Sequence, residues 1–292
     1  MSEPVHIIGA SGKSGQALTR RLLADGIGVV PVVRSADWRP PADLRAHPRL
    51  APPRRADLGD ETALTAALAD AGRIVTTAHA RHTAALLAAA PRAARLVLLG
   101  STRRFTRFPD ALADEITAGE AAFLASGRAG VMLHPTMIYG ATGEENVQRL
   151  AAMLRRLPFL PLPGGGRSLI QPIHQDDVTA SIRAALDMPW AGPETLVLAG
   201  AEAVTYAEFA RAVAAAGLPR PRIFAMPAAL LILAARITTR LSLPVRANPG
   251  EIRRLLEDKA FSTAPMLARL GVRPCGLAAG LARTFQAAKM AV

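Results

Sequence analysis

The sequence is poor in cysteine and in aromatic residues. Its one cysteine, Cys275, excludes an internal disulfide and is typical of a reducing compartment. Aromatic residues make up 4% of the 292 residues, and the chain has neither the Cys/His spacing of a zinc site nor a patch of stacking aromatics. We therefore predict no metal site and no nucleic-acid partner.

Lysine is also scarce, because only Lys13, Lys259 and Lys289 occur among 35 basic residues. The others are arginines spread along the whole chain, and the net charge is +12. A spread of this kind does not form a recognition helix for DNA or RNA. We interpret the charge as a basic surface that attracts anionic ligands.

Long apolar runs and a secretion-type leader are absent, which predicts a cytoplasmic protein. The most apolar stretch lies within 228–246, where leucines and an isoleucine can form one face of a helix and Arg236, Arg240 and Arg246 are basic. Two interpretations stay open. Such a helix more often packs on its own domain, but it can also lie on an anionic membrane.

The most informative segment is Val5 to Gly15, with the sequence Val-His-Ile-Ile-Gly-Ala-Ser-Gly-Lys-Ser-Gly. A β-branched run leads into Gly9, Gly12 and Gly15, and an apolar helical pattern follows. This order predicts a strand, a tight turn and a helix N-terminus whose free N–H groups attract an anion. The usual anion at such a turn is the pyrophosphate of a dinucleotide.

Short β-branched runs alternate with helical stretches through the first half of the chain. We predict strands at 5–8, 29–33, 73–77, 96–99, 131–134 and 195–198, with a weaker one near Leu50, and helices between them at 16–24, 61–69, 81–90 and 110–126. This alternation predicts βαβ units and a mostly parallel, doubly wound sheet in residues 1–140.

After Gly140 the pattern changes. Helices are predicted at 146–156, 175–187, 206–216, 228–240, 249–257, 263–270 and 277–288, and the prolines and glycines of 158–166 predict a loop. Residues 141–292 are thus expected to form a smaller, mainly helical lobe, partly interleaved with the first domain.

Arg34 ends the second predicted strand, 25 residues after Gly9. An acidic residue there would bind the ribose 2′-hydroxyl of NAD, whereas a basic one favours the 2′-phosphate of NADP. Lys13 adds a second positive charge within the glycine turn. We therefore expect NADP as cofactor, with NAD as the alternative.

Asp57 and Leu58 precede Gly59, Asp60 and the helix predicted from about Glu61, at the expected end of a strand. An aspartate there can accept a hydrogen bond from the adenine amino group while the leucine packs on the ring. The alternative is a helix-start signal, but Asp60 can fill that role by itself.

These motifs occur in order with Gly100-Ser101-Thr102, with His-Pro-Thr-Met-Ile-Tyr-Gly at 134–140 and with Gln-Pro-Ile-His-Gln-Asp-Asp-Val at 171–178. The series covers nearly the whole chain and resembles the extended and atypical short-chain dehydrogenase/reductases, specifically the NAD-dependent epimerase/dehydratase group. The resemblance implies a Rossmann domain for NAD(P) and a lobe that holds a small-molecule substrate. It also implies that Ser11, Ala78 and Pro135 contact the cofactor.

The sequence departs from that family at its catalytic pair. The family normally uses a Tyr-x-x-x-Lys pair in the helix after the Ser/Thr strand end, but residues 110–126 contain neither tyrosine nor lysine. Ser101 and Tyr139 are the remaining candidates for catalytic hydroxyls, although Ser101 can equally cap the next segment and Tyr139 can simply pack.

Two functions therefore remain. The first is an NADP(H)-dependent oxidoreductase or epimerase-like enzyme without the usual pair. The second is a non-catalytic NADPH-binding sensor or assembly protein, similar to the accessory subunit of respiratory complex I. The identity of the substrate and the oligomeric state do not follow from the sequence.

Overall fold

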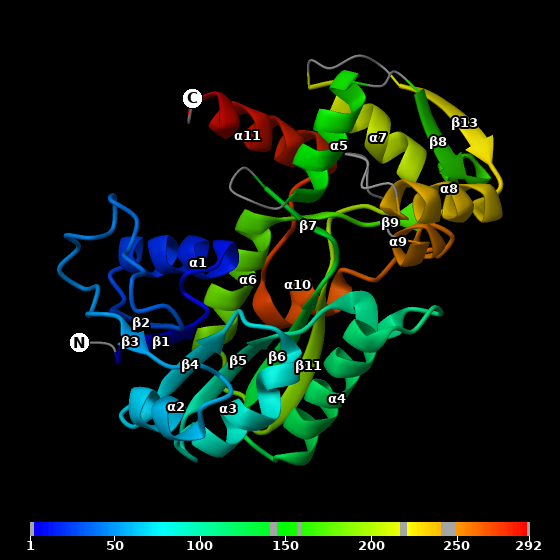
Figure 1. Ribbon diagram of the computed structural model, residues 1–292. Coiled ribbons are helices and arrows are strands. Elements are labelled where there is room, and N and C mark those ends of the chain that lie inside the picture. Colours follow the sequence, from blue (N-terminus) through cyan, green and yellow to red (C-terminus); the bar gives the residue numbers. More distant parts are fainter. Residues whose placement is uncertain (1–2, 141–144, 157–158, 217–220, 241–248, 291–292) are drawn as a thin grey trace.

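The structure is a computed structural model that describes residues 3–140, 145–156, 159–216, 221–240 and 249–290. Figure 1 shows a sheet domain that carries the N-terminus and a second lobe beside it. In chain order the strands are β1 (Val5–Ile8), β2 (Val29–Val33), β3 (Arg54–Arg55), β4 (Arg73–Thr76), β5 (Arg95–Leu99), β6 (Gly130–Pro135), β7 (Ile138–Tyr139), β8 (Phe159–Pro163), β9 (Leu169–Ile170), β10 (Ile173–His174), β11 (Pro193–Leu198), β12 (Val204–Thr205) and β13 (Arg222–Met226).

The helices alternate with these strands. They are α1 (Lys13–Ala24), α2 (Glu61–Leu68), α3 (Thr83–Ala89), α4 (Ala111–Ala125), α5 (Glu145–Arg156), α6 (Gln175–Asp187), α7 (Tyr206–Ala214), α8 (Ala228–Arg240), α9 (Pro249–Arg254), α10 (Ala264–Leu270) and α11 (Leu277–Met290). Short 3-10 helices cover η1 (Ala80–His82), η2 (Thr102–Phe105) and η3 (Gly164–Gly166).

The main sheet has the strand order β11-β6-β5-β4-β1-β2-β3, and all its strands run parallel. The chain moves outward from β1 through β2 to β3, then returns to β4 on the other side of β1. This reversal between β1 and β4 is the switch point of a doubly wound sheet. The predicted fold class is confirmed.

Two layers of helices cover the sheet, each over its own hydrophobic core. On one face α1, α6 and α10 pack on the strands through Leu18, Leu22, Ile182 and Met266, all completely buried. On the other face α2, α3 and α4 do the same through side chains such as Leu64 and Phe123. The strands are apolar on both sides, as expected for a parallel sheet buried between helices.

The lobe is built mainly by α5, α7, α8, α9 and α11, shown at the top of Figure 1. A third core lies inside it, with Leu150, Leu160, Phe209 and Leu281 among its members. The chain returns from the lobe to the main sheet, because β11 pairs with β6 and α6 packs against α1. Residues from both halves of the sequence therefore build the sheet domain.

Two local predictions were wrong. The weak strand near Leu50 is only an isolated bridge to Val29, and the strand beside β2 is β3, a few residues later. Within the predicted loop, Phe159–Pro163 forms strand β8, which pairs in parallel with β13. Pro158 lies outside the described residues. The remaining prolines are tolerated because this is a two-stranded sheet, in which proline can occupy a position with no partner on its N–H side.

Candidate cofactor and active site

The turn between β1 and α1 uses its three glycines for three different purposes. Gly9 has φ +81°, a conformation that favours glycine, and its carbonyl accepts a hydrogen bond of 2.9 Å from the N–H of Gly12. A Cβ on Gly15 would lie 2.2 Å from the Gly9 carbonyl oxygen, so glycine is needed there to bring α1 close to β1. Gly12 is exposed, and a Cβ on it would meet only that same oxygen, at 3.3 Å.

Gly12 is the residue that precedes the first turn of α1. The first turn of a helix carries the positive end of the helix dipole. A helix N-terminus with an open glycine beside it, at the switch point of the sheet, fits a dinucleotide pyrophosphate.

Other predicted cofactor residues stand at the same edge of the sheet. Ser11 and Lys13 are exposed in the glycine turn, and the exposed Arg34 follows β2, which pairs directly with β1. Ala78 follows β4 and is half-buried, whereas Pro135 is the last residue of β6 and is fully buried. The carboxyl ends of parallel strands meet at one edge, so these residues line one side of the sheet domain.

Asp57 and Leu58 lie just beyond β3 at this edge. The Asp57 carboxylate accepts a 2.8 Å hydrogen bond from the N–H of Gly59, and Asp60 caps α2 by accepting from Ala63. Asp60 thus fills the helix-start role, and the exposed Asp57 needs no part in it. Leu58 faces a small pocket.

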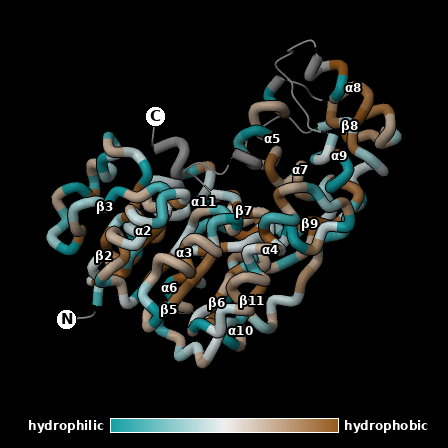
Figure 2. The backbone as a smooth tube through the Cα atoms, turned by 60° about the horizontal axis from the view of Figure 1, so that its bottom comes forward, coloured by the Kyte–Doolittle hydropathy of each residue, from teal (hydrophilic) through white to brown (hydrophobic). Residues whose placement is uncertain are grey.

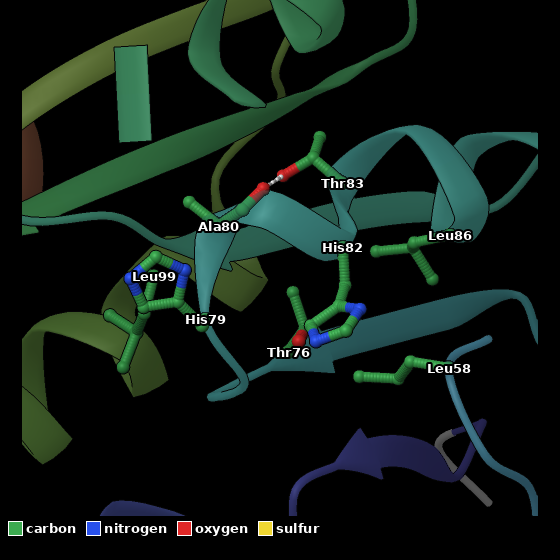
Figure 3. A pocket seen from close by; sticks show the side chains of 8 residues that line it. All are labelled: Leu58, Thr76, His79, Ala80, His82, Thr83, Leu86 and Leu99. Atoms are coloured by element: carbon green, nitrogen blue, oxygen red, sulfur yellow. Dashed lines mark hydrogen bonds between the residues drawn. The ribbon is translucent and has the colours of Figure 1, made fainter. Parts of the chain in front are cut away.

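Figure 3 shows this pocket, in which Leu58, Thr76 and the His82 ring lie together. The lining residues are Leu58, Thr76, His79, Ala80, His82, Thr83, Leu86 and Leu99. They come from the segment after β3, from the end of β4 with η1 and α3, and from the last residue of β5. Its lining combines apolar side chains with the imidazole rings of His79 and His82.

Ser101, one of the two candidate catalytic residues, is half-buried at the end of β5. Its hydroxyl accepts a 3.2 Å hydrogen bond from the N–H of Arg103 and so caps η2. Its own N–H donates to Nδ1 of His134, at 3.2 Å. A Cβ on the neighbouring Gly100 would lie 2.4 Å from that same nitrogen, so glycine is required for the ring to approach.

His134 belongs to a buried cluster that sequence reasoning did not single out. Its Nε2 lies 3.4 Å from Oε2 of Glu120, and that oxygen lies 2.5 Å from Nε of Arg104. Burial, assisted by the Arg104 charge, lowers the pKa of His134 to about 4. Burial also raises the pKa of Glu120, against the opposing effect of Arg104. The cluster holds the Ser101 peptide through the hydrogen bond from the Ser101 N–H to His134.

Tyr139, the other candidate, is completely buried in the core of the lobe. Its ring packs edge-on against His174, with centroids 5.2 Å apart, and a Cβ on Gly280 would lie 2.0 Å from its hydroxyl oxygen. Burial raises the pKa of this phenol. These contacts give Tyr139 a packing role in the structure.

Helix α4 follows β5 and η2, where the family that the sequence resembles has its catalytic helix. Its sequence, Ala-Leu-Ala-Asp-Glu-Ile-Thr-Ala-Gly-Glu-Ala-Ala-Phe-Leu-Ala, contains no tyrosine or lysine. Its inward carboxylate, Glu120, contacts Arg104 and His134 instead.

Comparison with known proteins agrees with this geometry. Residues 9–117 match the family model described as NAD(P)H-binding, so the chain carries an NAD(P)H-binding domain. No curated protein sequence matches the chain.

Solved structures share the fold over almost the whole chain. A putative epimerase from Burkholderia cenocepacia has a TM-score of 0.75 at 20% identity, covering 99% of each chain. The UDP-glucose 4-epimerase of Thermus thermophilus, complexed with NAD, has a TM-score of 0.71 at 19% identity, covering 99% of this chain and 100% of that one. The NADPH-dependent quinone oxidoreductase of Escherichia coli, complexed with NADPH, has a TM-score of 0.73 at 20% identity, covering 96% of this chain and 99% of that one. The fold and the cofactor class are those that the sequence resemblance implied.

Proposed function

We propose that the protein is an NADP(H)-dependent oxidoreductase or epimerase-like enzyme whose substrate lies between the sheet domain and the lobe. The observation that carries this proposal is the glycine turn at the switch point, where Gly12 leaves the N-terminus of α1 open. Similar folds that bind NAD in an epimerase and NADPH in a quinone oxidoreductase support the same class of chemistry.

The dinucleotide has a complete set of candidate ligands. The first turn of α1 would hold the pyrophosphate, and Lys13 and Arg34 would flank the 2′-phosphate of the adenosine ribose. Asp57 would accept from the adenine amino group while Leu58 packs on the ring. When bound, the nicotinamide supplies or accepts a hydride.

Ser101 is the chain's best-placed hydroxyl for a substrate carbonyl. It stands at the end of β5, and its peptide is held by the neutral ring of His134. A serine hydroxyl can donate a hydrogen bond to a carbonyl oxygen and stabilise the charge that develops there. The proton itself would come from water or from the substrate, because α4 offers neither tyrosine nor lysine.

The absence of tyrosine and lysine from α4 favours a second candidate, a non-catalytic NADPH-binding sensor or assembly protein. General acid–base catalysis contributes about 10²–10⁴-fold, so a chain without the Tyr-x-x-x-Lys pair would lose most of the rate that this chemistry needs. Cofactor binding would survive, because the glycine turn is independent of α4.

A survey of ligands that co-purify with the protein, by native mass spectrometry, distinguishes the two candidates. The enzyme proposal predicts NADP(H) together with a second small molecule, and oxidation of NADPH when that molecule or its carbonyl form is added. NADPH alone, with no turnover of any carbonyl or nucleotide sugar, would support the sensor. Absence of any dinucleotide, and failure to bind added NADPH, would refute both.

A further inference from the structure

Helix α8 exposes its most apolar face. Leu230 and Leu233 are each 54% exposed and Ile237 is 48% exposed, while Ala235 on the other side of the helix is buried. The three large side chains are spaced i, i+3 and i+7, which puts them on one side of the helix. These three members of the apolar face predicted from the sequence are therefore about half exposed.

The small sheet next to α8 is exposed in the same way. Phe159 on β8 and Phe224 on β13 are 52% and 42% exposed. The register pairs Arg222 with Phe159 and Phe224 with Pro161, so both aromatic rings lie on one face of this sheet. The alternate residues of β8, Leu160 and Leu162, turn inward to the core of the lobe.

These elements form one continuous end of the lobe. β13 leads through Pro227 directly into α8, and α8 packs against β8. Figure 2 shows this end, with the brown of α8 beside β8 and α9, on the side of the lobe away from β2 and β3. We call Phe159, Arg222, Phe224, Leu230, Leu233, Arg236 and Ile237 the apolar-basic surface.

The segments that contain β8, β13 and α8 carry charge of one sign. Between Glu208 and Glu251 the sequence has six arginines and no aspartate, glutamate or lysine. Between Glu145 and Asp176, the segment that contains β8, it has four arginines and again no acidic residue. Arg222 and Arg236 are exposed among the apolar side chains.

We propose that the apolar-basic surface binds an anionic lipid bilayer, with α8 lying in the plane of the interface. Exposed leucine, isoleucine and phenylalanine would enter the boundary between headgroups and acyl chains, and the arginines would pair with anionic headgroups. A second copy of the chain is a poorer partner, because a symmetric contact would bring the arginines of one copy against those of the other.

No helix in the described ranges is long and apolar enough to cross a membrane. The binding proposed here is peripheral and depends on both apolar burial and charge.

Flotation with phospholipid vesicles tests the proposal. The full chain is mixed with vesicles of phosphatidylcholine alone, or with vesicles in which part of it is replaced by phosphatidylglycerol. We expect the protein to float with the anionic vesicles, and to float less as salt is added, because salt screens the arginine–headgroup attraction.

Paired variants identify the surface. Leu230→Gln with Leu233→Gln should lower the vesicle partition coefficient by at least about tenfold, since two buried aliphatic side chains are lost. Arg236→Gln should lower it by about fivefold. The matched controls Leu124→Gln, on α4 and 44% exposed, and Arg92→Gln, exposed before β5, should leave it unchanged. Affinity for NADPH should be the same in all of them.

Four results would overturn the proposal. They are no flotation with anionic vesicles, equal flotation with neutral ones, equal losses in the control variants, or a concentration-dependent dimer that the leucine variants dissociate. The last result would assign the surface to a second copy of the chain.

Discussion

Nε2 of His134 lies 3.4 Å from a carboxylate oxygen of Glu120, and both residues are 3% exposed or less. Since Nδ1 of the same ring accepts the Ser101 N–H, the ring proton belongs on Nε2, where it faces the carboxylate. The end of β5 is thereby tied to helix α4 through the penultimate residue of β6. The segment that bears Ser101 is therefore linked to α4 through His134.

The first prediction concerns pH and stability. The folded state holds the pKa of His134 at about 4, below its ordinary value of 6.5, so the unfolded chain binds a proton more readily. Stability that is present above pH 6.5 should therefore fall as the pH drops toward 4, by about 2 kcal/mol between about pH 7 and about pH 5. The raised pKa of Glu120 acts in the opposite direction, because the folded state then binds that proton more tightly.

Urea unfolding of the parent and of His134→Gln across this range isolates the histidine. The variant should be less stable at neutral pH, but its free energy of unfolding should fall less on acidification, because its amide does not titrate. An equal loss in both proteins would show that His134 is not responsible.

The second prediction separates packing from binding in the glycine turn. Gly15→Ala would push a Cβ into the Gly9 carbonyl and the Ala10 Cα, at 2.2 and 2.8 Å, and should lower the free energy of unfolding by about 1–3 kcal/mol. Gly12→Ala is the matched control, because its Cβ meets the Gly9 oxygen only at 3.3 Å. Thermal unfolding that ranks the two variants in the reverse order would contradict this account of the turn.

The third prediction concerns Gly12, the exposed glycine that precedes α1. Gly12→Val would place a branched side chain in the space that the pyrophosphate needs, so NADPH binding should be lost while the circular dichroism spectrum is retained. Normal binding of NADPH by this variant would mean that the turn is not a phosphate site.

The fourth prediction concerns the two candidate hydroxyls. Turnover should be slow, and Ser101→Ala should reduce whatever rate is found by about tenfold to a hundredfold, as expected for loss of one hydrogen bond to a developing charge. Tyr139→Phe should not change kcat, because its hydroxyl is buried and has no hydrogen-bond partner in the described part of the chain. If Tyr139→Phe lowered kcat strongly and Ser101→Ala did not, Tyr139 and not Ser101 would be the catalytic hydroxyl. Rapid turnover of a nucleotide sugar would contradict the expectation of slow catalysis.

The sequence predicted the parts of the molecule that depend on local signals. The β-branched runs of β1 and β2, the glycines of the first turn and the Asp60 cap each act within a few residues. Strand β8 was missed because Pro161 and Pro163 argue against a strand, and only its distant partner β13 explains it. The His134 cluster was missed for a similar reason: Ser101 and His134 are 33 positions apart in the chain, and their contact follows from the pairing of β5 with β6.

The strength of NADPH and NADH binding tests the central claim most directly. Calorimetric titration of the parent protein should give at least about tenfold tighter binding of NADPH, roughly 1.4 kcal/mol, because in our proposal Lys13 and Arg34 flank the 2′-phosphate. Arg34→Asp should abolish this preference, whereas Arg92→Asp, at the opposite edge of the sheet, should keep it. Equal affinities of the parent protein for the two cofactors would contradict the account.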